Sequence, residues 1–128
     1  MTKLIFEGKV FTGKGEGKKY IGLPWVKQQI EEKMGFSPFL GTLNLNLTEE
    51  SAKRRKKLEK IKTIQINPHQ GYCVGLLFKA FIDNSRCAAL IPELGYYPKN
   101  VLEIIAPMNL REELELKDED NVTVTVQA

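Results

Sequence analysis

The sequence contains few of the residues that build disulfide frameworks, metal centres and nucleophilic triads. Its 128 residues include two cysteines and one histidine. Cys73 and Cys87 lie in apolar surroundings without a Cys-x-x-Cys spacing, which indicates buried thiols in a reducing compartment, with a disulfide as the alternative. His69 lies in a turn without partners at metal-ligand spacing, so we assign it no role. The scarcity of histidine also argues against a Ser-His or Cys-His catalytic pair.

Long apolar runs and a strong excess of one charge are also missing. No segment approaches the roughly 20 apolar residues that span a bilayer, and the first residues lack the apolar core of a signal peptide. Lysine and arginine total 19 against 16 acidic residues, a net charge of +3, which does not by itself demand nucleic acid. We expect a cytoplasmic protein with no membrane or nucleic-acid partner, folded as one domain over residues 1–128.

Short segments of β character, separated by turn residues, dominate the chain. About six short strands with one or two short helices predict an all-β protein, a small closed six-stranded barrel. The segments that favour strands are residues 4–11, 39–47, 63–66, 72–82, 86–91, 101–105 and 121–126.

Helices are predicted at three places. Pro24 at a first helical position and Gly35 after the last apolar position predict a helix between them. Thr48 can cap a second helix, whose basic residues 53–60 are expected to lie on the surface. A short helix is expected near residues 110–116, whereas the segment Tyr20–Leu23 is expected to be extended.

The most informative segment is residues 41–47, with the sequence GTLNLNL. Its leucines share one face of a strand, and Thr42, Asn44 and Asn46 share the other. Thr42 and Asn44 thus present two neutral oxygen ligands, which Mg²⁺ accepts when phosphates supply the negative charge. The alternative is a pair of solvent-facing strand residues, although asparagine is a poor strand former.

A second segment, residues 13–19 with the sequence GKGEGKK, can bring backbone close to a polyphosphate. It is neither a Walker A motif nor a dinucleotide fingerprint, because Lys18 stands where both require glycine. Taken alone, it could be a flexible hairpin tip. Together with residues 41–47, it predicts a magnesium–nucleotide site on a β scaffold.

Glu103 is a carboxylate inside the apolar strand 101–105, on the same face as Val101 and Ile105. It is either an edge residue or ion-pair partner, or a residue that contacts a ligand. Phosphoryl transfer needs no nucleophile–base pair, because positioning and charge neutralisation supply most of its rate. The absence of such a pair is therefore compatible with a phosphotransferase.

These motifs together resemble the archaeal CTP-dependent riboflavin kinase family over nearly the whole chain. The resemblance rests on four motifs in the family's order, at residues 7–8, 13–18, 41–45 and 103–111. It implies a cradle-loop, riboflavin-kinase-like barrel that transfers the γ-phosphate of CTP to the 5′-hydroxyl of riboflavin. The products would be FMN and CDP, and the cofactor Mg²⁺.

The resemblance also implies residue roles by position. Mg²⁺ would be held by Thr42 and Asn44. Glu103 would lie near the ribityl chain of the flavin. It is also a candidate general base, and the alternative is a reaction without a base. The loop at residues 94–100 would line the flavin as well, with Gly95 contacting it through the main chain. The implied nucleotide-binding residues are Lys14, Gly15, Glu16, Gly17, Lys18, Lys19, Met108, Asn109, Leu110 and Arg111.

A second reading belongs to another class of protein. A small barrel that ends with the sequence of residues 110–124 also resembles swapped-hairpin transcription factors, which bind DNA as dimers. A DNA-binding protein has no use for the Gly-Thr-Leu-Asn sequence at residues 41–44. We therefore favour the kinase, and expect it to be a monomer.

Overall fold

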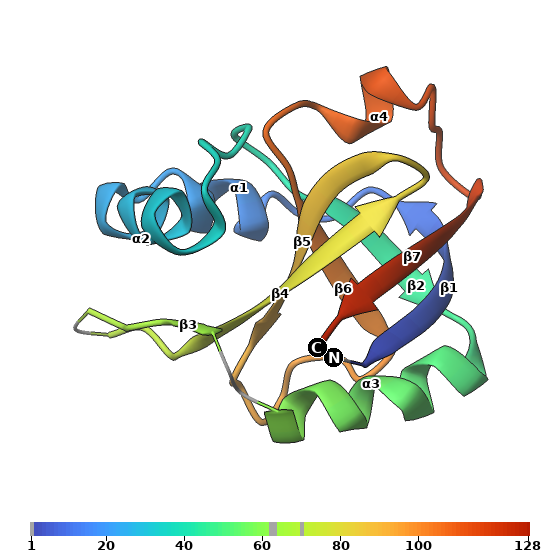
Figure 1. Cartoon of the computed structure of the whole chain (residues 1–128), viewed down its shortest axis with the longest axis horizontal. Helices are drawn as coiled ribbons and strands as arrows, with labels where there is room; N and C mark the ends of the chain where they lie inside the picture. Colours follow the sequence, from blue (N-terminus) through green and yellow to red (C-terminus); the bar gives the residue numbers. More distant parts are fainter. Residues whose placement is uncertain (1, 62–63, 70) are drawn as a thin grey trace.

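The computed structural model describes residues 2–61, 64–69 and 71–128 (Figure 1). None of the helices in these ranges is both long and apolar enough to cross a membrane. The strands are β1 (Lys3–Phe11), β2 (Leu43–Leu47), β3 (Ile64–Ile66), β4 (Gly75–Ile82), β5 (Ser85–Pro92), β6 (Val101–Ile105) and β7 (Asn121–Gln127). The helices are α1 (Glu16–Ile21), α2 (Pro24–Met34), α3 (Glu49–Ile61) and α4 (Leu110–Glu113).

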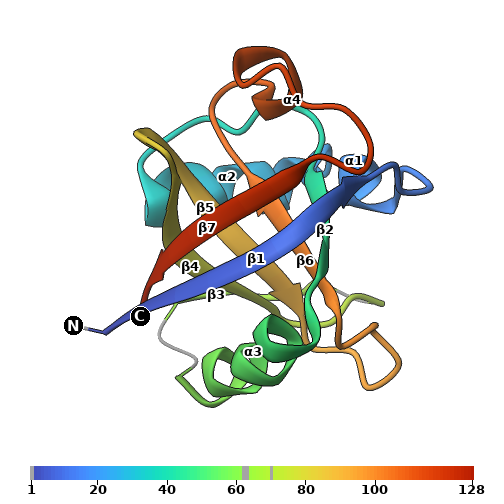
Figure 2. The same ribbon diagram turned by 90° about the vertical axis from the view of Figure 1, so that its right-hand side faces the viewer.

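Six of the strands close into an antiparallel barrel in the order β4-β5-β6-β2-β1-β7. Closure follows because β7 pairs with β1 along one edge and with β4 along the other. Strand β3 pairs with β4 outside the ring. Figure 2 shows β7 and β1 side by side across the front of the barrel. The predicted closed six-stranded barrel is confirmed, and the described chain adds β3 and four helices to it.

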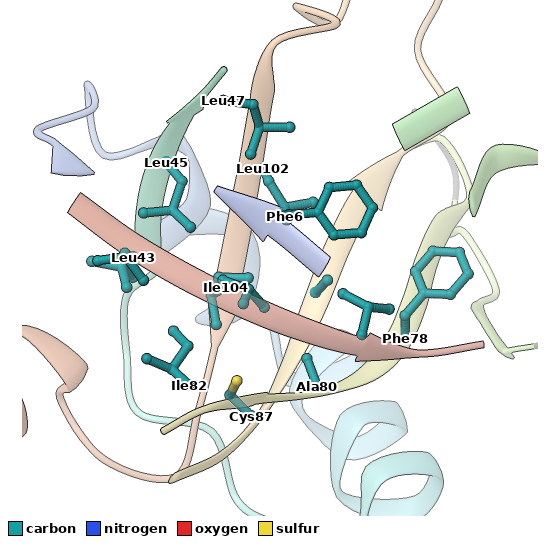
Figure 3. Close-up of a cluster of buried hydrophobic side chains, with 14 of the residues drawn as sticks. Phe6, Leu43, Leu45, Leu47, Phe78, Ala80, Ile82, Cys87, Leu102 and Ile104 are labelled. Atoms are coloured by element: carbon teal, nitrogen blue, oxygen red, sulfur yellow. The ribbon is translucent and has the colours of Figure 1, made fainter. Parts of the chain in front are cut away.

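Alternation along the strands fills the barrel. In β7 three valines point inward and are at most 6% exposed, while Thr123 between two of them is exposed. The three leucines of β2 point inward in the same way. Figure 3 shows side chains from five strands converging on this core: Phe6, Leu43, Leu45, Leu47, Phe78, Ala80, Ile82, Cys87, Leu102 and Ile104. The inward leucines of β2 leave its polar side chains on the outer face.

A second apolar cluster lies between the barrel wall and α2. Val26, Ile30 and Met34 of α2 are buried against outward-facing residues of β4 and β5, among them Leu77 and Leu90. Strands β4 and β5 are therefore apolar on both faces rather than alternating. The predicted helix is confirmed with its end signals, because Pro24 opens it and Gly35 closes it at φ 79°.

The expectation of an extended segment at Tyr20–Leu23 is wrong. Tyr20 and Ile21 form the last residues of α1, and Gly22 follows as its C-cap. Gly15, at φ 87°, precedes the helix, and Ile21 is buried in the cluster beneath α2. Burial of Ile21 thus offsets the low helix propensity of a glycine-containing segment.

Helix α3 is more than a surface excursion. Thr48 caps it as predicted, since the Thr48 Oγ1 accepts a hydrogen bond from the Ser51 amide at 3.2 Å. Leu58 joins the barrel core, and Arg55 is buried as well. The helix lies across one end of the barrel (Figure 2). Lys62 and Thr63, which the sequence placed in this segment and in the following strand, lie outside the described residues.

Both cysteines are free thiols. Cys87 lies in the barrel core, and burial raises the pKa of its thiol to about 12. Cys73 is partly buried. The prediction of a buried thiol is therefore confirmed for Cys87, and the alternative of a disulfide is wrong.

Neighbouring residues of β1 offer a test of the inward and outward faces. Phe6 is fully buried in the core, whereas Ile5 beside it is 50% exposed. We expect Phe6→Ala to lower the free energy of unfolding by about 3–5 kcal/mol, because it leaves a cavity. Ile5→Ala should cost about 1 kcal/mol or less. Urea denaturation of both variants measures the difference, and equal losses would contradict this assignment of faces.

Candidate active site

Three side-chain oxygens meet on the outer face of β2 and β6. The Thr42 hydroxyl lies 3.1 Å from Asn44 Oδ1 and 3.2 Å from Glu103 Oε1. The register between the strands explains the meeting, because Asn44 pairs directly with Glu103. Thr42 and Asn44 lie two residues apart and so share the face opposite the leucines. The predicted ligand pair and the predicted carboxylate thus form one cluster.

Tyr97 completes this cluster; it belongs to the loop at residues 94–100 that was expected to line the flavin, but its contact with Glu103 was not predicted. Its hydroxyl donates a hydrogen bond of 2.5 Å to Glu103 Oε2. The two oxygens of Glu103 therefore have different partners, Thr42 on one side and Tyr97 on the other. Burial, followed by the negative charge of Glu103, raises the pKa of Tyr97, so its hydroxyl remains a proton donor.

The glycine segment packs directly on the cluster. A Cβ at Gly13 would lie 2.6 Å from Asn44 Nδ2, and a Cβ at Gly17 would lie 2.5 Å from Thr42 Oγ1. Gly15 differs, because open space surrounds it but its φ is +87°. Two of these glycines therefore permit close approach, and the third provides the left-handed conformation that begins α1.

Two cavities that share a wall lie beside this cluster. The first, of about 540 Å³, is lined by the glycine segment together with Thr42, Asn44 and Glu103. It also contains the cationic side chains Lys14, Lys18 and Arg111. A small neighbouring cavity of about 200 Å³ is bounded by the apolar side chains Phe39, Met108 and Leu110. The wall that these two cavities share consists of Gly41, Thr42 and Arg111.

A third cavity, of about 420 Å³, also adjoins the first, and its lining includes four tyrosines, so we call it the aromatic cavity. Tyr20, Tyr72 and Tyr96 line it, and the Tyr20 hydroxyl is buried without a hydrogen-bond partner in the described part of the chain. Burial raises the pKa of Tyr20. Trp25 supports this wall from outside the lining, edge-on to Tyr20 at 6.2 Å and stacked on His69 at 4.3 Å. The wall shared by the first and third cavities consists of Glu16, Gly17, Tyr97 and Glu103.

Arg111 is held in place at the boundary of the small cavity. Its Nη2 donates to Asp118 Oδ1 at 2.6 Å, and Thr12 donates to the same carboxylate. These two hydrogen bonds hold the pKa of Asp118 below its usual value, with that from Arg111 the stronger. Asn109 caps α4 by accepting from the Arg111 amide at 3.1 Å. The guanidinium therefore lies between the small cavity and the 540 Å³ cavity.

The remaining predicted residues divide among the three cavities. Lys14 to Lys18 line the 540 Å³ cavity, whereas Lys19 lines the aromatic one. Met108, Asn109 and Leu110 line the small cavity. Around Gly95, it is Leu94, Tyr96 and Tyr97 that line the aromatic cavity. Tyr96 and Tyr97 belong to the loop at residues 94–100 that was expected to line the flavin, whereas sequence reasoning missed Tyr20 and Tyr72.

The Thr42–Asn44 pair fits one edge of a magnesium coordination sphere. Adjacent ligands of an octahedral Mg²⁺ are about 2.9 Å apart when each lies about 2.0–2.1 Å from the ion, and these two oxygens are 3.1 Å apart. The described residues contain no group of three or more acidic, histidine or cysteine side chains that could hold a metal. A metal held by Thr42 and Asn44 would thus depend on a ligand's anionic oxygens for most of its negative charge.

Comparison with known proteins shows that the chain is similar to riboflavin kinases. The CTP-dependent riboflavin kinase model, described as Domain of unknown function DUF120, matches residues 10–126. The riboflavin kinase of Methanosarcina barkeri is 38% identical over 128 residues, which cover 97% of this chain and 57% of the relative. The riboflavin kinase of Archaeoglobus fulgidus is 38% identical over 124 residues, which cover 94% of this chain and 53% of the relative. The riboflavin kinase of Pyrobaculum aerophilum is 41% identical over 126 residues, which cover 93% of this chain and 59% of the relative. The chain thus spans little more than half the length of these relatives.

The contact between Gly17 and the cluster can be tested without any ligand. Gly17→Ala should push α1 away from Thr42 and Glu103, because overpacking typically costs about 1–3 kcal/mol. We expect amide exchange at Lys19 and Gly22, whose amides bond within α1, to accelerate about tenfold or more. Gly95→Ala is the control, since nothing lies within 4 Å of its Cβ position. Unchanged exchange in Gly17→Ala would contradict the close packing.

Proposed function

Since this chain belongs to the CTP-dependent riboflavin kinase family, we propose that it transfers the γ-phosphate of CTP to the 5′-hydroxyl of riboflavin. The products are FMN and CDP. The nucleotide's identity comes from the family, and the residues that carry out the reaction are proposed from the geometry. Family membership favours this activity over the DNA-binding alternative.

The observation that carries the proposal is the order of the three cavities. The small cavity, whose lining mixes apolar and polar residues, shares a wall with the 540 Å³ cavity, which carries three cationic side chains, and that cavity shares a wall with the aromatic one. A nucleoside triphosphate and a flavin need this order, with base, phosphates and acceptor in a row. The γ-phosphate would then lie at the wall shared by the 540 Å³ cavity and the aromatic cavity, next to Glu103 and Tyr97.

The small cavity and the neighbouring 540 Å³ cavity suit a nucleoside triphosphate. The pyrimidine would fill the small cavity against Phe39, Met108 and Leu110. The phosphates would lie along the glycine segment, near the cationic groups of Lys14, Lys18 and Arg111. Backbone amides of a glycine segment can approach phosphate oxygens closely and add partial positive charge. Main-chain groups of Asn109 and its neighbours would contact the base or ribose.

The third cavity suits the flavin. An isoalloxazine ring is flat and largely apolar, which matches the tyrosine side chains that line this cavity. We place Lys19 on this side rather than with the phosphates, and Gly95 as a main-chain contact beside Tyr96. The ribityl chain would extend from this cavity toward Glu103, so that its 5′-hydroxyl reaches the shared wall.

The residues at the junction bind, orient and neutralise. Glu103 accepts a hydrogen bond from the ribityl chain and directs the 5′-hydroxyl toward the γ-phosphorus. Lys14, Lys18 and the amides of the glycine segment compensate charge on the equatorial and leaving oxygens. Thr42 and Asn44 would hold Mg²⁺, which when bound neutralises charge on the phosphate oxygens.

An assay of the purified protein tests the proposed activity. Riboflavin and Mg²⁺ are incubated with each of the four nucleoside triphosphates, and FMN is measured by chromatography. We expect FMN with CTP and much less with the other three. No FMN with any of the four would refute the activity, and equal yields with all four would refute the preference for CTP.

The metal ligands can be tested with a matched control on the same strand. Thr42→Val and Asn44→Leu remove one oxygen ligand each and should lower turnover by at least about 100-fold, since positioning and charge compensation supply most of the rate. Asn46→Leu makes the same change two residues further on, at an exposed side chain that bonds only Asn100 among the described residues. It should retain activity near wild type. Full turnover in Asn44→Leu, with an unchanged circular dichroism spectrum, would contradict the assignment.

A further inference from the structure

Helix α3 carries a buried guanidinium that the proposed reaction does not use. Arg55 is 1% exposed, and its Nη1 donates to the Pro98 carbonyl at 2.8 Å. The guanidinium carbon lies 5.4 Å from the centre of the Tyr97 ring. Glu59, one turn further along the helix, lies 3.7 Å from Nη2. Burial lowers the pKa of Arg55, and its Nε has no partner within the described residues.

Stability alone is a poor explanation for this arrangement. Removing a guanidinium from water costs several kcal/mol, and well-packed apolar residues in its place are often neutral or stabilising. The Nε of Arg55 has no hydrogen-bond partner among the described residues, and its ion-pair partner Glu59 is partly exposed. The helix would bury its apolar residues, Leu58 among them, without a charge at this position. The role of the guanidinium is therefore inferred from the groups that it contacts.

Among the described residues, its hydrogen bond and its cation–π contact outside α3 are both with the loop that joins β5 to β6. The helix reaches three consecutive residues of that loop: Tyr97 and Pro98 through Arg55, and Lys99 through Glu59 at 3.5 Å. In Figure 2 the orange loop lies beside α3 at the end of the barrel. Tyr97 is also the residue that donates to Glu103. The contacts thus run from Arg55 to Tyr97, from Tyr97 to Glu103, and from Glu103 to Thr42.

We propose that Arg55 is a positioning residue that acts through Tyr97: by holding the ring and the adjacent carbonyl, it keeps the Tyr97 hydroxyl on Glu103 Oε2. With one oxygen occupied in this way, Glu103 directs Oε1 toward Thr42 and the shared wall of the two large cavities. Apart from Arg55, the two ends of the loop are bonded to other strands and segments, through Glu93 to Val74 and through Asn100 to β2. The Tyr97 amide itself bonds only within the loop, to the Leu94 carbonyl. The consequence for catalysis rests on the proposed function, whereas the placement of Glu103 does not.

The placement can be measured without turnover. The ¹³C resonance of the Glu103 carboxyl group is followed in the full chain for Tyr97→Phe, which removes only the hydroxyl, and for Arg55→Met, which removes the charge. We expect both variants to shift this resonance in the same direction. The matched control is Arg54→Met, because the neighbouring guanidinium bonds the Ile5 carbonyl of β1 instead of the loop. A shift in Tyr97→Phe with none in Arg55→Met would overturn the proposal.

Kinetics then tests the effect on the reaction. Since small misplacements of a reacting group are costly, Arg55→Met and Tyr97→Phe should each lower kcat about 10–100-fold, with KM for both substrates changed less than about threefold. The double variant should be no slower than the slower single variant, because both changes break the same connection. A purely structural role predicts losses that multiply, and that result would overturn the proposal. If Arg55→Met does not fold, Arg55→Lys replaces it in both measurements.

The two proposals fail in different ways. If the wild-type chain makes no FMN, the proposed function is wrong, and the Glu103 resonance still decides whether Arg55 positions the carboxylate. If the wild type is active and Arg54→Met is normal, wild-type kcat in Arg55→Met refutes the positioning role alone.

Discussion

The site depends on the inward packing of the leucines of β2. Leu43, Leu45 and Leu47 fill the barrel, so the residues between them must face outward, and strict alternation leaves no other choice. A shift of one residue in the β2–β6 register would bury Asn44 and expose leucine, which the core strongly opposes. The same register sets Glu103 opposite Asn44. A packing constraint in the core thus determines where the polar atoms of the site lie.

The close approach of the glycine segment to the site depends on the absence of a Cβ atom. Gly13, before α1, lies against Asn44, and Gly17, in the first turn of α1, lies against Thr42 and Glu103, at distances that a Cβ would prevent. The Arg55–Tyr97 contact approaches the same cluster from the opposite end of the barrel. The glycine segment therefore reaches Glu103 by close backbone approach, and the loop that carries Tyr97 is held beside Glu103 by the buried charge of Arg55.

Sequence reasoning succeeded where a single strong pattern decided the outcome. The alternation in residues 41–47 and in β7, together with Pro24 and Gly35, predicted the barrel strands and α2. It failed where tertiary packing overrode local preference, as when burial of Ile21 turned residues 20–21 into helix. The basic run of α3 was treated as uniform, because periodicity alone does not tell which of its six lysines and arginines a neighbouring loop will cover. The tyrosines of the aromatic cavity come from separate segments, 20, 72 and 96–97, that only the folded chain brings together.

The wall shared by the two large cavities has a thermodynamic consequence. Glu16, Gly17, Tyr97 and Glu103 belong to both cavities, so a ligand that moves or orders any of them in one cavity changes the free energy of binding in the other. Linkage requires this effect to be reciprocal: the factor by which the first ligand alters the affinity for the second equals the factor in the reverse direction. The four residues of this wall thus couple the two occupants, in addition to any direct contact between the ligands at the wall.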